Sequence, residues 1–179
     1  GSNRLTVSYH SGRRIQATAA DFGTNGSGAS AVSGGWVELG RTTLGSAGDD
    51  ITVSSLANKR YYMVLTNTFD SGNTSIYRRL GAGSVDTGSN YAGRVNTNGG
   101  TDGTYTSVGN IDFGKGHAGA QDTFQVEYIS NLATKEKLIT GHAVTQNDAG
   151  AGYSPQRREY VGKWANTSNA MDTFNQNNI

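Results

Sequence analysis

Carboxylate and amide side chains that could bind a cation gather at two turns of the sequence. Asp49 and Asp50 follow a stretch rich in Gly and Ser, and Asp86 is closely followed by Asn90. Ca²⁺ takes about six to eight oxygen ligands, so these four residues are the candidate calcium ligands. Asx-turns, in which such side chains bond to their own backbone, explain the same residues without a metal. The sequence therefore predicts no cofactor, with Ca²⁺ binding as the alternative.

Groups that could perform acid–base or nucleophilic catalysis do not occur in the spacings that such chemistry requires. His10, His117 and His142 are far apart in the sequence and lack the spacing of zinc ligands. The Gly-Ser-Gly fragment at residues 26–28 has no strand before it and no helix after it, both of which a nucleophile elbow needs. The glutamates are predicted on solvated strand faces or in turns: Glu38, Glu127, Glu136 and Glu159. We therefore predict that the protein is not an enzyme.

Two arginine pairs near tyrosines, at residues 78–79 and 157–158, could form a basic and aromatic patch for nucleic acid. The formal net charge is only +1, which gives little attraction to nucleic acid or to a membrane, so pairing with nearby glutamates is the favoured interpretation. Trp36 and Trp164 lie in strand patterns and are predicted in the core. Exposed aromatic rings that stack on sugars remain the basis of a carbohydrate-binding alternative.

The elements that position these residues are predicted to be β-strands. Glycine is abundant (26 residues) and charged residues are few (16%), which favours short strands joined by tight turns over helices. Alternation in residues 123–128 predicts a strand with Phe124, Val126 and Tyr128 facing the core. Residues 61–65 are apolar on both faces, as expected of a central strand. Turn signals between the predicted strands complete the pattern of an all-β, jelly-roll-like antiparallel sandwich.

The chain is predicted to consist of three parts. Residues 1–22 form an arm with one strand, in which Leu5, Val7 and Tyr9 share a face. Residues 23–35 are a linker rich in Gly and Ser, and residues 36–179 are the sandwich domain, which opens with a strand at 36–44. No apolar run approaches the roughly 20 residues of a transmembrane helix, so no membrane partner is expected.

Five segments carry a resemblance to a known group of proteins: residues 36–44 (WVELGRTTL), 86–92 (DTGSNYA), 98–102 (NGGTD), 133–139 (ATKEKLI) and 157–166 (RREYVGKWAN). The body from Trp36 onward, about four fifths of the chain, resembles a module in structural proteins of tailed phages and related environmental viral sequences. The resemblance implies a jelly-roll-like sandwich that serves as a head appendage, tail component or attachment domain. It implies no catalytic residues.

The end of the sequence departs from this pattern. Modules of this kind continue past an Asn-rich stretch into a last apolar strand, whereas Ile179 directly follows the Asn-rich residues 175–178. We therefore expect a sandwich that lacks a strand and exposes an unpaired edge. The arm strand with Leu5, Val7 and Tyr9 is predicted to fill this edge, in its own subunit or in a neighbouring one.

The predicted function is that of a non-enzymatic virion component, a capsid appendage or a tail or attachment domain, located in the virion or outside the cell. Its predicted partners are copies of itself or other virion subunits. One alternative is an extracellular self-assembling filament subunit, joined by donor-strand complementation through the arm. The other is a carbohydrate-binding module that recognises a cell-surface glycan. Neither nucleic acid nor a membrane is a predicted partner.

Overall fold

The computed structural model describes residues 36–70, 72, 75–115 and 121–178. The chain divides into two compact units, Gly1–Val37 and Glu38–Ile179, and all of the strands below belong to the second. The described residues contain no helix, so the all-β prediction is confirmed; accordingly, no helix among them could cross a membrane. The predicted arm, with Leu5, Val7 and Tyr9, and the linker at 23–35 lie outside the described residues.

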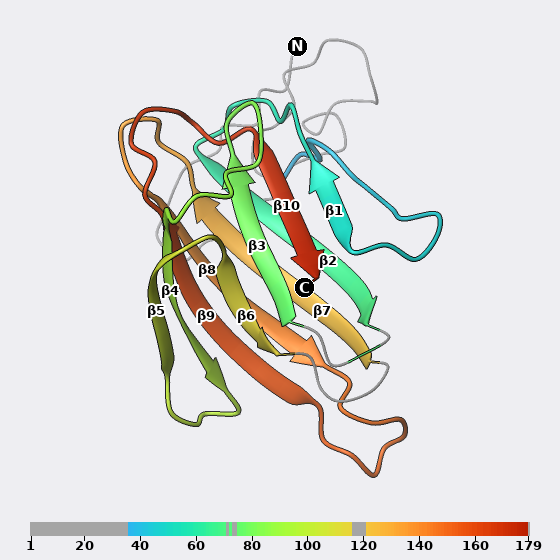
Figure 1. The fold of residues 1–179 in the computed structure, drawn as a ribbon. Helices are drawn as coiled ribbons and strands as arrows, with labels where there is room; N and C mark the ends of the chain where they lie inside the picture. Colours follow the sequence, from blue (N-terminus) through green and yellow to red (C-terminus); the bar gives the residue numbers. More distant parts are fainter. Residues whose placement is uncertain (1–35, 71, 73–74, 116–120, 179) are drawn as a thin grey trace, which may run out of the picture. The chain divides into compact units, whose positions relative to one another are not determined.

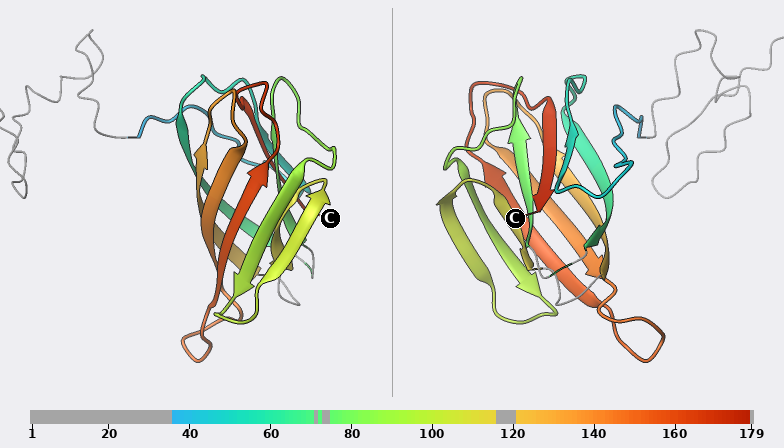
Figure 2. Two further views of the ribbon diagram at one scale, coloured as in Figure 1. Left: turned by 90° about the vertical axis from the view of Figure 1, so that its left-hand side faces the viewer. Right: turned by 45° about the vertical axis from the view of Figure 1, so that its right-hand side comes forward.

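The described residues form ten strands in two antiparallel sheets that pack face to face as a β-sandwich (Figures 1 and 2). The smaller sheet has the strand order β1-β10-β3-β6, and the larger has the order β2-β7-β8-β9-β4-β5. The strands are β1 Asp50–Val53, β2 Tyr61–Asp70, β3 Ser75–Gly81, β4 Tyr91–Thr97, β5 Gly103–Val108, β6 Ile111–Lys115, β7 Gln121–Ser130, β8 Lys137–Thr145, β9 Gln156–Trp164 and β10 Thr173–Asn178.

The chain crosses between the two sheets at most of its connections. If the β8–β9 hairpin is set aside, four strands remain in each sheet, in the orders β1-β10-β3-β6 and β2-β7-β4-β5. The chain then changes sheet after every strand except β4, which is the alternation of a jelly-roll-like sandwich. The β8–β9 hairpin is inserted between β7 and β4, and it widens the larger sheet by two strands.

Local sequence explains where strands end and how closely they pack. Asn98 and Gly99 adopt positive φ values of 54° and 76° in the β4–β5 turn, a conformation that Asn and Gly tolerate best. Gly141 of β8 lies opposite Tyr160 of β9. A Cβ at Gly141 would lie 2.4 Å from the Cζ atom of Tyr160, so only glycine leaves room for this ring to lie across β8.

The interior of the sandwich contains both apolar and polar side chains. Around Trp164 lie apolar side chains that are at most 1% exposed: Leu80, Tyr91, Ile129, Trp164 and Met171. In addition, β7 turns a row of polar side chains inward, all of them at most 5% exposed: Gln121, Thr123, Gln125 and Glu127. Such a core needs polar partners on the facing sheet, because a buried polar group without one is costly.

The inward face of β7 is the reverse of the predicted one. Phe124 and Tyr128 are 44% and 46% exposed, whereas Gln125 and Glu127 are at most 1% exposed. The prediction that Phe124, Val126 and Tyr128 face the core is therefore wrong. The placement of Glu127 on a solvated face is wrong as well, because its carboxylate pairs with Arg78 of β3 inside the sandwich.

The predicted strand at 36–44 is absent, and residues 36–49 form no strand. Trp36 is 58% exposed, so its predicted core position is wrong, whereas Trp164 is 1% exposed as predicted. The guanidinium of Arg41 pairs with the carboxylate of Glu38 at 2.9 Å. Apart from the half-buried Leu39, residues 36–44 are exposed, so the segment buries too little apolar area to hold a place in a sheet.

Two expectations about sheet edges are also corrected. The Asn-rich stretch is itself a strand, β10, which lies between β1 and β3 in the smaller sheet. The sandwich therefore does not lack a strand at this position, and the reason given for an open edge was wrong. Conversely, the strand with residues 61–65 is not central: β2 forms one edge of the larger sheet, with β7 as its one neighbour among the described strands.

Candidate functional site

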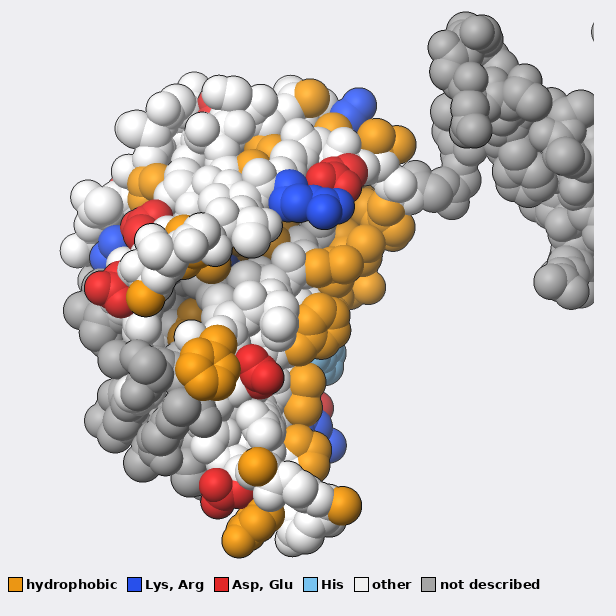
Figure 3. All heavy atoms as spheres, turned by 90° about the vertical axis from the view of Figure 1, so that its right-hand side faces the viewer, with side chains coloured by type: hydrophobic (Ala, Val, Ile, Leu, Met, Phe, Trp, Pro, Cys, Tyr) orange, Lys and Arg blue, Asp and Glu red, His pale blue; other side chains and the backbone are white. Residues whose placement is uncertain are grey.

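The larger sheet carries an exposed apolar surface on the side that faces away from the smaller sheet. Figure 3 views the molecule from the side where β2 lies, so the larger sheet is seen edge-on. Hydrophobic side chains gather along the right-hand edge of this view. Eight of its apolar side chains are 43–67% exposed, and two, Met63 and Val126, are half-buried. We call this surface the outer face, and it consists of Tyr61, Met63, Leu65, Phe69, Phe124, Val126, Tyr128, Leu138, Val144 and Val161.

Strand register brings these side chains together. Leu65 of β2 lies opposite Val126 of β7, which lies opposite His142 of β8. Residues opposite one another in an antiparallel sheet point to the same side, so each row extends across the strands. The neighbouring rows pair Met63 with Tyr128 and Phe124 with Val144 in the same way. The apolar surface therefore extends over β2 and β7 and reaches β8 at Leu138 and Val144, which the polar Thr140 and His142 separate.

Charged side chains border the outer face on β9 and β4. Lys163 pairs with Glu136 at 3.0 Å, and Arg94 pairs with Asp102 at 2.8 Å. Arg157 approaches Glu159, its second neighbour on β9, at 3.8 Å, which agrees with the predicted pairing of this arginine. These pairs balance positive with negative charge. An apolar centre with a polar, charge-balanced border is the usual composition of a protein–protein interface.

A buried ion pair lies directly beneath the outer face. The guanidinium of Arg78 donates from Nε and NH2 to the carboxylate of Glu127, and both side chains are 0% exposed. NH2 of Arg78 also donates to Oε1 of Gln176 at 2.9 Å, and its guanidinium carbon lies 3.7 Å from the centre of the Phe174 ring. This network joins β3 and β10 to β7. It gives Glu127 a charged partner inside the sandwich and so accounts for the burial of this carboxylate.

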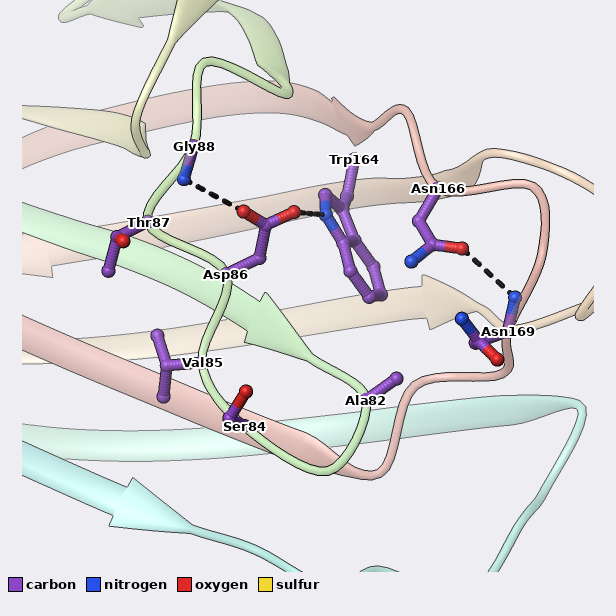
Figure 4. A pocket seen from close by; sticks show the side chains of 9 residues that line it. All are labelled: Ala82, Ser84, Val85, Asp86, Thr87, Gly88, Trp164, Asn166 and Asn169. Carbon is purple, nitrogen blue, oxygen red and sulfur yellow. Dashed lines mark hydrogen bonds between the residues drawn. The ribbon is translucent and has the colours of Figure 1, made fainter.

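The loop between β3 and β4 encloses a shallow hollow of about 350 Å³ beside Trp164 (Figure 4). The Asp86 carboxylate accepts hydrogen bonds from the Trp164 indole at 2.7 Å, from the Gly88 amide at 2.8 Å and from the Asn90 side chain at 2.9 Å. Burial opposes ionisation of Asp86, but these three hydrogen bonds outweigh it and hold its pKa below the ordinary value. Asp86 therefore fixes the loop against Trp164.

The predicted calcium ligands occupy two different places in the fold. Asp50 lies on β1, where its carboxylate accepts hydrogen bonds from Thr52 and Asn175 at 2.7 and 2.8 Å. Asp49 precedes β1 and is exposed, whereas Asp86 and Asn90 belong to the loop after β3. The structure thus does not bring the two pairs together. Within the described ranges, no group of three or more His, Asp or Glu side chains could hold a metal ion.

The outer face was not found from the sequence because its residues were assigned to the core. Phe124, Val126 and Tyr128 form the more apolar of the two alternating sets in β7. The other set contains the charged Glu127, which can face the core only with a cationic partner. That partner, Arg78, lies 49 positions away, so no local signal in the sequence identified the inner face of β7.

The comparisons with known proteins give no relative for this chain. No family model matches the sequence, and neither the curated proteins nor the solved structures contain a match.

Proposed function

We propose that the protein is a non-enzymatic structural subunit that associates with other protein chains through the outer face. The observation that carries this proposal is the exposed apolar surface that covers β2 and β7 and reaches β8, on which large side chains such as Leu65 and Phe69 are 58% and 67% exposed. Contiguous apolar surfaces of this kind mark interaction sites, because their exposure to water is unfavourable. Association would remove this surface from water.

Within this proposal, the assembly is a virion, and the chain is an appendage or tail component. The β-sandwich is the fold that the resemblance to tailed-phage structural proteins implies, and jelly-roll sandwiches occur in viral capsids as well as in lectins. The filament alternative has support from β2. This edge strand of ten residues has a neighbour on one side among the described strands, and an unpaired edge accepts an added strand.

A carbohydrate-binding function is the second candidate. The outer face contains four aromatic rings that could stack on sugars: Tyr61, Phe69, Phe124 and Tyr128. Aliphatic side chains such as Leu65 and Val126 lie between these rings and offer no hydrogen bonds to sugar hydroxyl groups. The mixed aliphatic and aromatic composition therefore favours a protein partner over a glycan.

The test measures the mass of the intact chain by light scattering over a range of concentrations, together with negative-stain electron microscopy. We expect particles larger than the monomer, and we expect Leu65→Lys to dissociate them because it places a charge in the apolar centre. Thr106→Lys is the matched control, since Thr106 is exposed on β5 of the same sheet but outside the outer face.

Monomers at every concentration, or equal dissociation by the two lysine variants, would contradict assembly through the outer face. Binding of the monomer to a glycan array, lost in Phe124→Ala, would instead support the carbohydrate candidate. Circular dichroism of each variant checks that the sandwich remains folded.

A further inference from the structure

We infer that the partner of the outer face is the same face of a second copy of this chain, related to the first by a two-fold axis that passes close to Val126. This inference rests on the proposed function and adds the identity and geometry of the partner. It follows from the area of the surface, its symmetry and its charges.

The area suits a stable dimer. β7 has ten residues, which at about 3.4 Å per residue gives a length of about 34 Å. The outward side of the four strands from β2 to β9, which carries polar as well as apolar side chains, is about 19 Å wide at about 4.8 Å per strand. The surface is thus about 650 Å² in each copy and about 1,300 Å² in the pair, within the range of about 1,200–2,000 Å² for specific interfaces.

The surface is also able to pair with itself. In a two-fold contact, the same surface of both copies meets after a rotation of 180°. An apolar surface is therefore covered by the apolar surface of the other copy. Val126 lies in the middle of β7, between Leu65 of β2 and His142 of β8. A two-fold axis that runs along this row, across the strands, places each strand over its own copy, with Val126 over Val126 and Phe124 over Tyr128. Apolar side chains of β7 then cover apolar side chains, at the spacing of about 10 Å that packed sheets adopt.

The charges permit this contact. The border on β9 carries Arg157 next to Glu159 and Lys163 next to Glu136, so neither sign dominates where the copies meet. The whole chain has a formal net charge of +1, and two copies therefore repel each other only weakly. A nucleic acid or an acidic membrane would require an excess of positive charge that this border does not have.

The experiment uses site-specific crosslinking, which is clean because the sequence contains no cysteine. Val126→Cys places a single thiol at the predicted axis, where the two copies approach to about 10 Å. Thr106→Cys on β5 is the matched control. By the strand register, Thr106 lies about four residues, or about 14 Å, along β5 from the row that contains Val126, so two such thiols would be about 27 Å apart. Both variants of the full chain are treated with a bis-maleimide whose reach is about 10 Å.

We expect a dimer by light scattering, efficient crosslinking of Val126→Cys and none of Thr106→Cys. Adding Leu65→Lys should raise the dissociation constant of the dimer by at least about 100-fold, since symmetry places two lysines in the interface. A second variant, Val144→Ser, removes apolar area without adding charge, and we expect a smaller increase in the same direction.

Two results would overturn the inference, and they differ in their meaning for the proposed function. Assemblies that Leu65→Lys dissociates but Val126→Cys does not crosslink would show that the outer face binds a different surface, so only the two-fold pairing fails. A chain that stays monomeric at every concentration would refute both.

Discussion

Replacing Glu127 by Gln is expected to destabilise the folded chain by about 3–5 kcal/mol, although it changes only one atom of the side chain. Glu127 and Arg78 are 0% exposed, and the guanidinium of Arg78 donates to the Glu127 carboxylate from two nitrogens. The variant leaves the positive charge of Arg78 buried without an anion. Gln176 supplies one neutral oxygen to NH2 at 2.9 Å, which does not compensate for the lost carboxylate.

The size of this loss is large relative to the stability of a domain. Folded domains are stable by about 5–15 kcal/mol, so Glu127→Gln removes a substantial part of the total. Urea unfolding measures the difference, with fluorescence of the buried Trp164 as the signal. All variants are compared at one protein concentration, because self-association adds to apparent stability.

Two comparisons decide whether the buried charge is the cause. Glu136→Gln breaks the exposed pair with Lys163, whose side chains are 39% and 44% exposed, and should cost less than about 1 kcal/mol. The double variant Arg78→Met with Glu127→Leu removes both charges and should recover most of the stability that Glu127→Gln loses. A loss below about 1 kcal/mol in Glu127→Gln, or a double variant that is less stable than Glu127→Gln, would refute the reasoning.

Three further predictions concern the β3–β4 loop, the contact between Gly141 and Tyr160, and the arm. Asp86→Asn should lower the free energy of unfolding by about 1 kcal/mol at pH 7 and make it depend less on acid. The pKa of Asp86 is lower in the folded than in the unfolded chain, so this carboxylate stabilises the fold above about pH 4 and stops doing so as the pH falls. Urea unfolding at pH 7 and pH 3 in a Trp36→Phe background measures the difference, and an unchanged acid dependence would contradict the prediction. Gly141→Ala should destabilise by about 1–3 kcal/mol because the new methyl group meets the Tyr160 ring, whereas Gly152→Ala, with no atom within 4 Å of its Cβ position, should be nearly neutral; equal melting temperatures would argue against the close contact. Deletion of residues 1–22 should leave the melting temperature of the sandwich unchanged, because β10 occupies the centre of the smaller sheet, and a changed assembly state after this deletion would support strand donation to β2.

The fold class was accessible from the sequence because turns and strand propensity are local properties. The strand predicted at 123–128 lies within β7, and the turn predicted at Asp86 and Asn90 lies between β3 and β4. These features depend on residues close together in the chain. The preference of Gly and Asn for turns is sufficient to place them.

The direction in which strands face was not accessible, because it depends on distant partners. Glu127 is buried because Arg78 lies 49 positions earlier in the chain and on the facing sheet. β10 forms from asparagine and glutamine, which favour strands little, because β1 and β3 supply hydrogen-bonding neighbours on both sides. The candidate site was missed for the same reason. An alternating apolar row on β7 has the same sequence pattern whether it faces the core or forms an exposed surface.

The position of β10 between β1 and β3 also determines when the smaller sheet can be completed during synthesis. β10 leaves the ribosome after every other described strand, yet it separates β1 from β3 in the smaller sheet. Until then β1 lacks its one partner among the described strands, whereas the β7-β8-β9 hairpins can already form from nearby segments. A nascent chain interrupted before Thr173 would therefore display an incomplete smaller sheet to chaperones and proteases.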